Sequence, residues 1–202
     1  MRQYPRSALA RALCLLAALT LGRAAAGEDP ATIEALMATL GQVQRVQAAY
    51  TETLESGLLA TAISSPGQLE YVAPDRIVKT GAAGEGVEIH GDTIRVIQGG
   101  AVQELAIRDY APLEALVVAL RATFAGDLER LRRDFTLDFG TGDGRWTLLL
   151  RPRERTLAAV FERMEISGRG AEITAIEIAE AGGDRRRMQL ETRSLQRRAA
   201  GP

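Results

Sequence analysis

The stretch that decides the fold runs from Ser64 to Thr80 and reads SSPGQLEYVAPDRIVKT. Leu69 and Tyr71 alternate in it with polar neighbours, which is the two-residue period of a strand with one buried face. A Ser-Pro-Gly turn is predicted before this strand, and Pro74 ends it, because proline cannot donate a ladder hydrogen bond. The stretch is therefore either an ordinary hairpin edge or the second strand of a concave sheet that holds a ligand.

The same two-residue period extends to both sides of this stretch. Upstream it begins near Ala48, where Tyr50 and Leu54 alternate with threonine and glutamate. Downstream, Gly91-Asp92 and Gly99-Gly100 are predicted hairpin turns. They separate three short predicted strands: Gly86–His90, Thr93–Ile97 and Val102–Ile107.

A second set of strands is predicted in the last third of the chain. Its apolar positions alternate with polar ones, and glycine-rich turns at 140–144, 168–170 and 182–184 separate the segments. The alternating residues are Phe135, Leu137 and Phe139, then Trp146, Leu148 and Leu150, followed by segments near Ala159–Ser167, Glu172–Ala181 and Arg186–Ser194.

Helical spacing appears in two places. Asp29-Pro30 is predicted to cap a helix, whose apolar face comprises Ile33, Leu36, Met37, Leu40 and Val43. Residues 109–134 form two further predicted helices, which Gly126 separates. The first has its apolar face at Leu113, Leu116, Val117, Leu120 and Phe124, and the second at Leu128 and Leu131.

The predicted order along the chain is a helix, a set of strands, two helices and a second set of strands. This order predicts a mainly β fold with some α-helix. Tight turns between consecutive strands favour a meander, and the amphipathic helices need an apolar partner. We expect a curved, incomplete antiparallel β-barrel of about 10–11 strands, with an N-terminal helix and a helical lid over an apolar concave face.

The first 26 residues are predicted to be a secretory signal peptide. A basic segment precedes the ten-residue run Ala12–Leu21, which is too short to span a bilayer, and Ala24-Ala25-Ala26 resembles a cleavage site. Cys14 is interpreted as part of that run. We expect one domain at 27–195, a flexible tail at 196–202, and a periplasmic location.

Cleavage there would remove four arginines and no acids, lowering the basic residues from 25 to 21 against 26 acids, a net charge of −5. That balance argues against nucleic-acid binding. His90 is the only histidine, and no cysteine remains after cleavage. No Gly-x-Ser-x-Gly motif supplies the serine of a Ser-His-Asp triad, and one histidine without cysteines does not predict a zinc site. We expect no enzyme activity, no cofactor and no metal. Arg185-Arg186-Arg187 is a solvated turn or a contact for anionic headgroups or a membrane.

An apolar concave face leaves two alternatives open: a core that the side chains fill, or a hollow that binds acyl chains. Taken residue by residue, Tyr71, Phe124, Phe135, Phe139 and Trp146 are more typical of a filled core, whereas an aromatic content of only 4% favours the hollow. The candidate ligand-binding residues are Leu36, Leu40, Tyr50, Leu54, Leu69, Tyr71, Leu116, Leu120, Phe124, Leu137, Phe139, Trp146 and Leu148.

The order of these segments resembles the family of LolA, the periplasmic carrier of outer-membrane lipoproteins, and a LolA-related branch of it. The resemblance spans Ile33 to about Leu195. It is carried by GQLEYVAPDRIVK (67–79), EIHGDTIRVI (88–97), WTLLLRPR (146–153) and ISGRGAEITAIEIAEAGGDRRRMQL (166–190), with LRATFAGDLERLRRDFTLDF (120–139) typical of the branch.

The resemblance implies a lidded half-barrel whose apolar cavity takes acyl chains, and it implies that the strand before Pro74 bends toward the lid. LolA has a lid-latching arginine directly before this proline, where the present chain has Ala73. Ala73 and Arg76 are therefore the candidate lid contacts.

The expected function is a monomeric carrier or chaperone for acyl chains of a lipoprotein, glycolipid or other lipid-linked product. An inner-membrane exporter and an outer-membrane acceptor are the implied partners. The alternatives are a periplasmic lipid- or envelope-sensing regulator, an enzyme acting on lipid or glycan, and a solid structural module.

Overall fold

A single antiparallel sheet of eleven strands dominates the protein, as the computed structural model shows for residues 30–109, 111–159 and 161–199. The predicted signal peptide lies outside these residues. The strands are β1 (Val43–Glu55), β2 (Ile63–Val72), β3 (Arg76–Gly81), β4 (Gly86–His90), β5 (Thr93–Gln98), β6 (Ala101–Ala106), β7 (Phe135–Gly142), β8 (Arg145–Pro152), β9 (Phe161–Arg169), β10 (Glu172–Glu180) and β11 (Arg185–Arg197).

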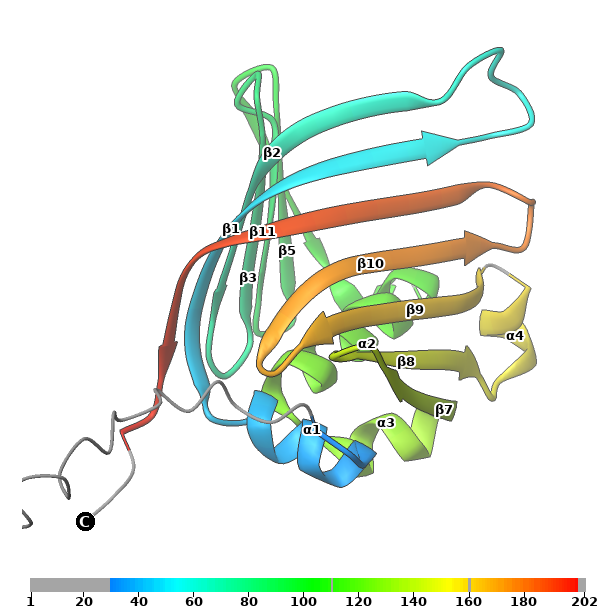
Figure 1. Ribbon diagram of the computed structural model, residues 1–202. Coiled ribbons are helices and arrows are strands. Elements are labelled where there is room, and N and C mark those ends of the chain that lie inside the picture. Colours follow the sequence, from blue (N-terminus) through cyan, green and yellow to red (C-terminus); the bar gives the residue numbers. More distant parts are fainter. Residues whose placement is uncertain (1–29, 110, 160, 200–202) are drawn as a thin grey trace, which may run out of the picture.

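The strand order β6-β5-β4-β3-β2-β1-β11-β10-β9-β8-β7 makes the first and last strands neighbours at the centre of the sheet. Their register runs from Val43 opposite Arg197 to Glu55 opposite Arg185, with irregularities near Arg45 and Ala48. The sheet curves strongly around this central pair, so that β2–β6 and β7–β10 form its two sides (Figure 1). The predicted curved antiparallel fold is confirmed.

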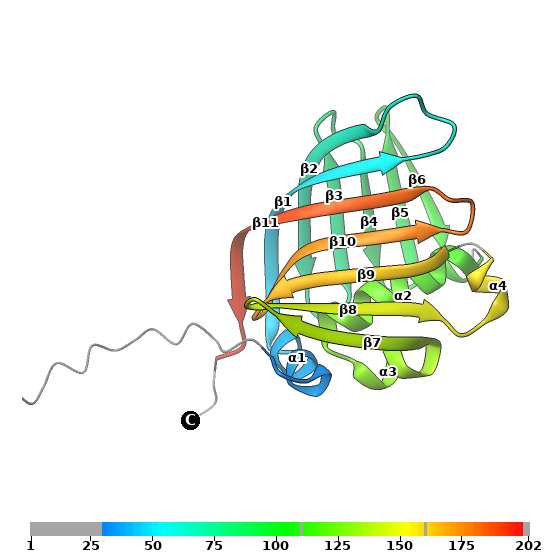
Figure 2. The ribbon, with the colours of Figure 1, turned by 45° about the vertical axis from the view of Figure 1, so that its right-hand side comes forward.

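The helices lie on the concave side, toward one end of the strands (Figures 1 and 2). None of those in the described ranges is long and apolar enough to cross a membrane. They are α1 (Ile33–Leu40), the 3₁₀ turn η1 (Ile107–Asp109), α2 (Ala111–Ala125), α3 (Leu128–Asp134) and the one-turn α4 (Arg155–Ala158), which the sequence reasoning did not predict.

The start of α1 differs from the prediction. Thr32 is the N-cap, because its side chain accepts a hydrogen bond from the Ala35 amide at 3.2 Å. Asp29, the predicted cap, lies outside the described residues. Val43, which was predicted on the helical face, begins β1 instead.

Gly126 separates α2 from α3 as predicted, with φ at +70°. A second reason for glycine here is contact with α1: a Cβ on Gly126 would lie 2.1 Å from the Met37 carbonyl oxygen. The turn between α2 and α3 therefore lies directly against the C-terminal end of α1.

The predicted Ser-Pro-Gly turn is wrong, since Ser65, Pro66 and Gly67 all lie inside β2. Pro66 is opposite Thr51 of β1, but the pairing of β2 with β3 begins only at Gly67. At Pro66 the strand thus has a neighbour on one side only, where a missing amide donor is tolerated.

Pro74 ends β2 beside the helices, as predicted, since it lines a pocket with Arg121 and Ala122 of α2; the chain turns back there into β3. Pro74 follows a cis peptide bond with Ala73 and lies in the tight turn that joins β2 to β3. The Tyr71 hydroxyl donates a hydrogen bond to the Pro74 carbonyl oxygen at 3.3 Å. The stretch is thus not an edge: β2 is the second strand of the curved sheet, paired with β1 on one side and β3 on the other.

Candidate functional site: the concave face of the sheet

The half of the concave face that lies under the helices is filled by side chains. The rings of Tyr71 on β2 and Phe124 on α2 stack with centroids 4.8 Å apart and an interplanar angle of 23°. Leu36 of α1 and Leu148 of β8 are fully buried in the same cluster. At these predicted cavity residues the structure therefore has a packed core.

Trp146 belongs to this core as well. Its indole Nε1 donates a hydrogen bond to the Gly170 carbonyl oxygen at 3.0 Å, and the side chain has no exposed surface. A Cβ on Gly168, the residue opposite it on β9, would lie 2.4 Å from the indole ring. The indole ring thus occupies the space that a side chain at position 168 would need, which gives Trp146 a structural role in the core.

An apolar pocket remains beneath α1, but its volume is only about 10 Å³. Leu40, Leu69 and Phe124 line it together with residues of β10 and β11. One water molecule needs roughly 10–15 Å³ measured in this way. The pocket is therefore too small for an acyl chain while the helices stay in place.

The other half of the concave face extends beyond the helices (Figure 2). The register places Leu190 opposite Tyr50, and Met188 opposite Glu52, so these side chains share the concave face with Leu54. Several apolar residues here are only partly buried: Val87 on β4, Val96 on β5, Ile178 on β10, and Met188 and Leu190 on β11. An apolar surface thus continues from the core into the open half.

Helix α2 lies at the boundary between the covered half and the open half of the concave face. Val117 and Ala119 are buried, whereas Leu116 and Leu120 keep part of their surface exposed. On the sheet, Leu137 and Phe139 of β7 are partly buried too. The predicted site residues thus divide into buried core residues and residues that solvent still reaches.

A polar group lies in the open half and was missed by the sequence reasoning. Lys79 of β3, the only lysine of the chain, binds Glu52 of β1 with Nζ 2.6 Å from Oε2. Its ammonium lies 5.1 Å from the centre of the Tyr50 ring. Burial, with the nearby Glu52 and Glu85 carboxylates, raises the pKa of the Tyr50 hydroxyl. The sequence does contain a signal for this group. Lys79 lies two residues after the core residue Ile77, and residues two apart in a strand lie on the same face of the sheet.

These residues line a pocket of about 310 Å³ between β1, β2, β3, β4 and β5. Gly81 of β3 lines the pocket, and Gly67 of β2 is the residue opposite it in the sheet. A Cβ on Gly67 would lie 2.3 Å from the Tyr50 hydroxyl oxygen, and one on Gly81 would collide with Glu85. The pocket thus combines an apolar wall with one cation and two carboxylates.

The two predicted lid contacts do not lie against the helices in the same way. Arg76 forms ion pairs with Glu88 at 2.8 Å and Glu70 at 3.2 Å, on the face opposite to the core residue Ile77. These carboxylates raise the pKa of Arg76, the Glu88 hydrogen bond most. Ala73 is partly buried against the core, and its amide donates to the Gln44 carbonyl at 2.9 Å.

The arginine that lies between a helix and this end of the sheet is Arg121 of α2. It lines a pocket of about 270 Å³ with Pro74 and Asp92. Its Nε and Nη2 atoms are buried without a hydrogen-bond partner among the described residues. Burial lowers the pKa of Arg121, and the charges of Asp75 and Asp92 partly oppose this.

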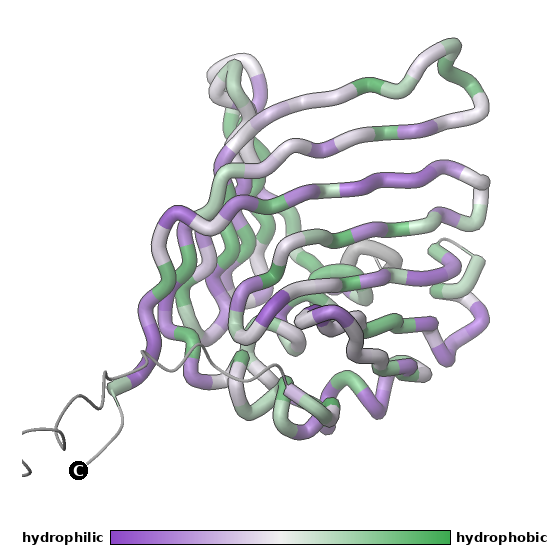
Figure 3. Tube along the Cα trace, in the orientation of Figure 1, coloured by the Kyte–Doolittle hydropathy of each residue, from purple (hydrophilic) through white to green (hydrophobic). Residues whose placement is uncertain are grey.

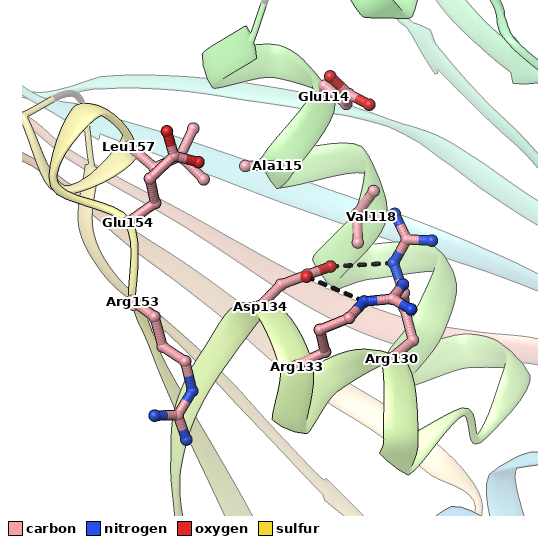
Figure 4. Close-up of a pocket in the computed structure, with 9 residues that line it drawn as sticks. All are labelled: Glu114, Ala115, Val118, Arg130, Arg133, Asp134, Arg153, Glu154 and Leu157. Atoms are coloured by element: carbon pink, nitrogen blue, oxygen red, sulfur yellow. Dashed lines mark hydrogen bonds and ion pairs between the residues drawn. The ribbon is translucent and has the colours of Figure 1, made fainter.

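A larger groove of about 340 Å³ lies between α2, α3 and α4 (Figure 4). Asp134 binds both Arg130 (2.9 Å) and Arg133 (3.3 Å), and Arg153 donates to the Phe135 carbonyl at 2.9 Å. The three arginines on this side thus already have carboxylate or carbonyl partners, which makes the groove a weaker candidate than the concave face.

The described residues hold no group of three or more His, Cys, Asp or Glu side chains that would bind a metal ion. His90 is exposed at the end of β4, opposite Thr93.

The fold and site define a class of protein: a half-barrel whose helices cover part of an apolar concave face. The chain belongs to the family described as outer membrane lipoprotein carrier protein LolA-like, whose profile matches residues 24–200. The resemblance found in the sequence is thereby confirmed. An outer-membrane lipoprotein carrier protein of Methylibium petroleiphilum is 29% identical over 178 residues, covering 87% of this chain and 83% of the relative.

Two solved structures are similar to this one at low identity. A LolA superfamily protein from Nitrosomonas europaea is 9% identical, with a TM-score of 0.43, and the match covers 84% of this chain and 95% of that one. A DUF1329 family protein from Desulfovibrio piger is 8% identical, with a TM-score of 0.44, covering 84% and 92%.

Proposed function

We propose that this protein is a periplasmic carrier that shields the acyl chains of a lipoprotein, glycolipid or other lipid-linked product between the inner and outer membranes. Membership of the LolA-like family supports this proposal. The observation that carries it is the partly exposed apolar surface beyond the helices, with Val87, Val96, Ile178, Met188 and Leu190 on the concave face.

This surface suits an acyl chain in its chemistry. An acyl chain that buries about 200 Å² of apolar surface gains about 5 kcal/mol, before the entropic cost of binding. A polar headgroup would find Lys79, Glu52 and Tyr50 in the adjacent pocket. An acyl chain would reach core residues such as Leu69 only if α2 moved away from the sheet. Leu116 and Leu120, which are partly exposed on α2, would move with the helix.

Native mass spectrometry of the protein isolated gently from the periplasm tests the proposal, with solvent extraction of the same sample. We expect a bound lipid, and we expect its loss in Leu120→Asp and Leu190→Asp, because a carboxylate on the apolar surface opposes acyl binding. Val102→Asp is the matched control, since Val102 is exposed on the opposite face of β6.

Two results would contradict the carrier. A lipid-free protein that also fails to bind added fatty acid would mean that the apolar surfaces serve the core alone. A protein that binds lipid, captures a membrane partner in a lipid-dependent manner and never transfers lipid between vesicles would be a sensor instead.

A further inference from the structure

The segment that joins β1 to β2 carries an unusual group of exposed apolar side chains. Leu58 is 97% exposed, Ile63 50% and Leu59 37%. They are three of the four large hydrophobic side chains exposed in the described part of the chain. No charged residue occurs between Glu55 and Glu70. Figure 3 shows the apolar tip at the far end of the long β1–β2 hairpin.

The backbone of this tip holds the side chains outward. The Leu58 amide donates to the Ser56 hydroxyl at 3.3 Å, and the Leu59 amide donates to the Ser56 carbonyl at 3.0 Å, which forms a compact turn. The tip therefore presents leucine side chains to solvent from a folded turn. Exposed apolar groups of this kind lower solubility and are typical of sites that contact a membrane or another molecule.

A basic cluster lies beside the tip on the neighbouring hairpin. Arg185, Arg186 and Arg187 of β11 are opposite Glu55, Leu54 and Thr53 of β1, and all three are exposed. Arg186 binds Glu180 at 2.9 Å. Arg185 and Arg187 have no acidic partner within 4 Å among the described residues, so two guanidinium groups remain available.

We propose that the β1–β2 tip inserts into the interface of a lipid bilayer while Arg185 and Arg187 contact lipid phosphates. Apolar side chains flanked by arginine are the combination that binds anionic membrane surfaces. A stable protein interface needs roughly 800 Å² on each partner, more than three side chains at a hairpin tip provide. Glu55, Glu180 and Asp184 lie near the arginines, which keeps binding reversible.

The position of the tip adds a consequence for the concave face. The concave residues Tyr50, Glu52 and Leu54 of β1 lead directly from the Lys79 pocket to the tip. A molecule docked through the tip would have the open half of its concave face near the bilayer. This inference goes beyond the proposed function, because it concerns the lipid-free protein and any cargo.

Flotation with vesicles of phosphatidylethanolamine and phosphatidylglycerol in a 3:1 ratio tests the inference on the exported, delipidated protein. We expect the wild type to float with the vesicles. Leu58→Ser with Leu59→Ser should reduce the partition coefficient at least about tenfold, and Arg185→Gln with Arg187→Gln about fivefold for each charge, less at high salt. Val102→Ser, the matched apolar-to-polar control, should float like the wild type.

A second measurement places the tip itself. Leu58→Trp should show a blue-shifted emission when vesicles are added, whereas Val102→Trp should not. The inference is overturned if the wild type does not float, if the double leucine variant floats equally well, or if binding needs protein-containing membranes, which would indicate a receptor. None of these results depends on a lipid extracted from the protein, so the carrier proposal is tested separately.

Discussion

Single atoms decide the shape of the concave pocket, and Gly67 is the clearest case. A Cβ there would lie 2.3 Å from both the Thr80 carbonyl oxygen and the Tyr50 hydroxyl. Because the carbonyl belongs to a paired strand and cannot move away, we expect Gly67→Ala to lower the free energy of unfolding by about 1–3 kcal/mol. Urea unfolding measures this.

Gly140→Ala is the matched control for that substitution. A Cβ on Gly140 meets no atom within 4 Å, so we expect a change near zero or a slight gain from the restricted unfolded chain. Equal losses in the two variants would show that strand propensity, and not the contact with Tyr50, explains the effect.

On the convex face, Glu70 is the centre of a charge network. Hydrogen bonds from Arg45 above all, and also from Gln47 and Arg76, lower the pKa of its carboxyl. A depressed folded pKa stabilises the protein above the unfolded pKa, near 4.3, and the contribution is lost as pH falls through the folded value.

Glu70→Gln should therefore destabilise the protein by about 0.5–1 kcal/mol at pH 7, and the difference from the wild type should vanish near pH 3. Urea midpoints measured from pH 3 to 7 provide the test. A difference that stays constant across this range would mean that packing of the side chain matters and its charge does not.

At the scale of elements, Arg121 determines how α2 meets the sheet. Its Nε and Nη2 atoms are buried without a hydrogen-bond partner among the described residues, and an unsatisfied buried donor costs stability. We expect Arg121→Met to raise the free energy of unfolding by about 1 kcal/mol. Arg151→Met, which removes an exposed ion pair with Asp138, should change it by less than about 0.5 kcal/mol. A lower free energy of unfolding in Arg121→Met would show that the attraction of Asp75 and Asp92 for the guanidinium outweighs the cost of burying it.

Most elements could be predicted from the sequence because their signals are local. The hairpin Gly86–His90 with its Gly91-Asp92 turn follows from the two-residue period and the glycine. The prediction errors arise where the local structure depends on which strand pairs with the segment. Pro66 suggests a turn, but β2 has a partner on one side only there. Pro74 ends the strand as predicted, but only the structure shows that β3 follows it.

The candidate site was predicted less well, for a physical reason. Alternation identifies which residues face inward, and Tyr71, Trp146 and Leu148 do. It gives no information on whether a helix covers them. Only the placement of α2 shows that Tyr71 and Phe124 are stacked in the core, while the partly exposed apolar surface of the concave face lies beyond the helices.

For the whole molecule, the division into a covered and an open half predicts a difference in local stability. The distal part of β1 has fewer buried apolar side chains than the part near the helices, so it should open at lower free energy. Hydrogen exchange should be at least about tenfold faster at residues 51–63 than at 43–50, and bound lipid should slow it. Equal rates would mean that both halves unfold as one unit.

The pairing of β1 with β11 also has a consequence in time. These strands are the first and last of the chain, and the two sides of the sheet are joined through them. The curved sheet therefore cannot close until the chain has been synthesised as far as residue 197. Until then the chain carries two half-sheets with exposed edges, which fold slowly and invite aggregation. Synthesis of its final strand thus sets the earliest moment at which the protein can begin to work.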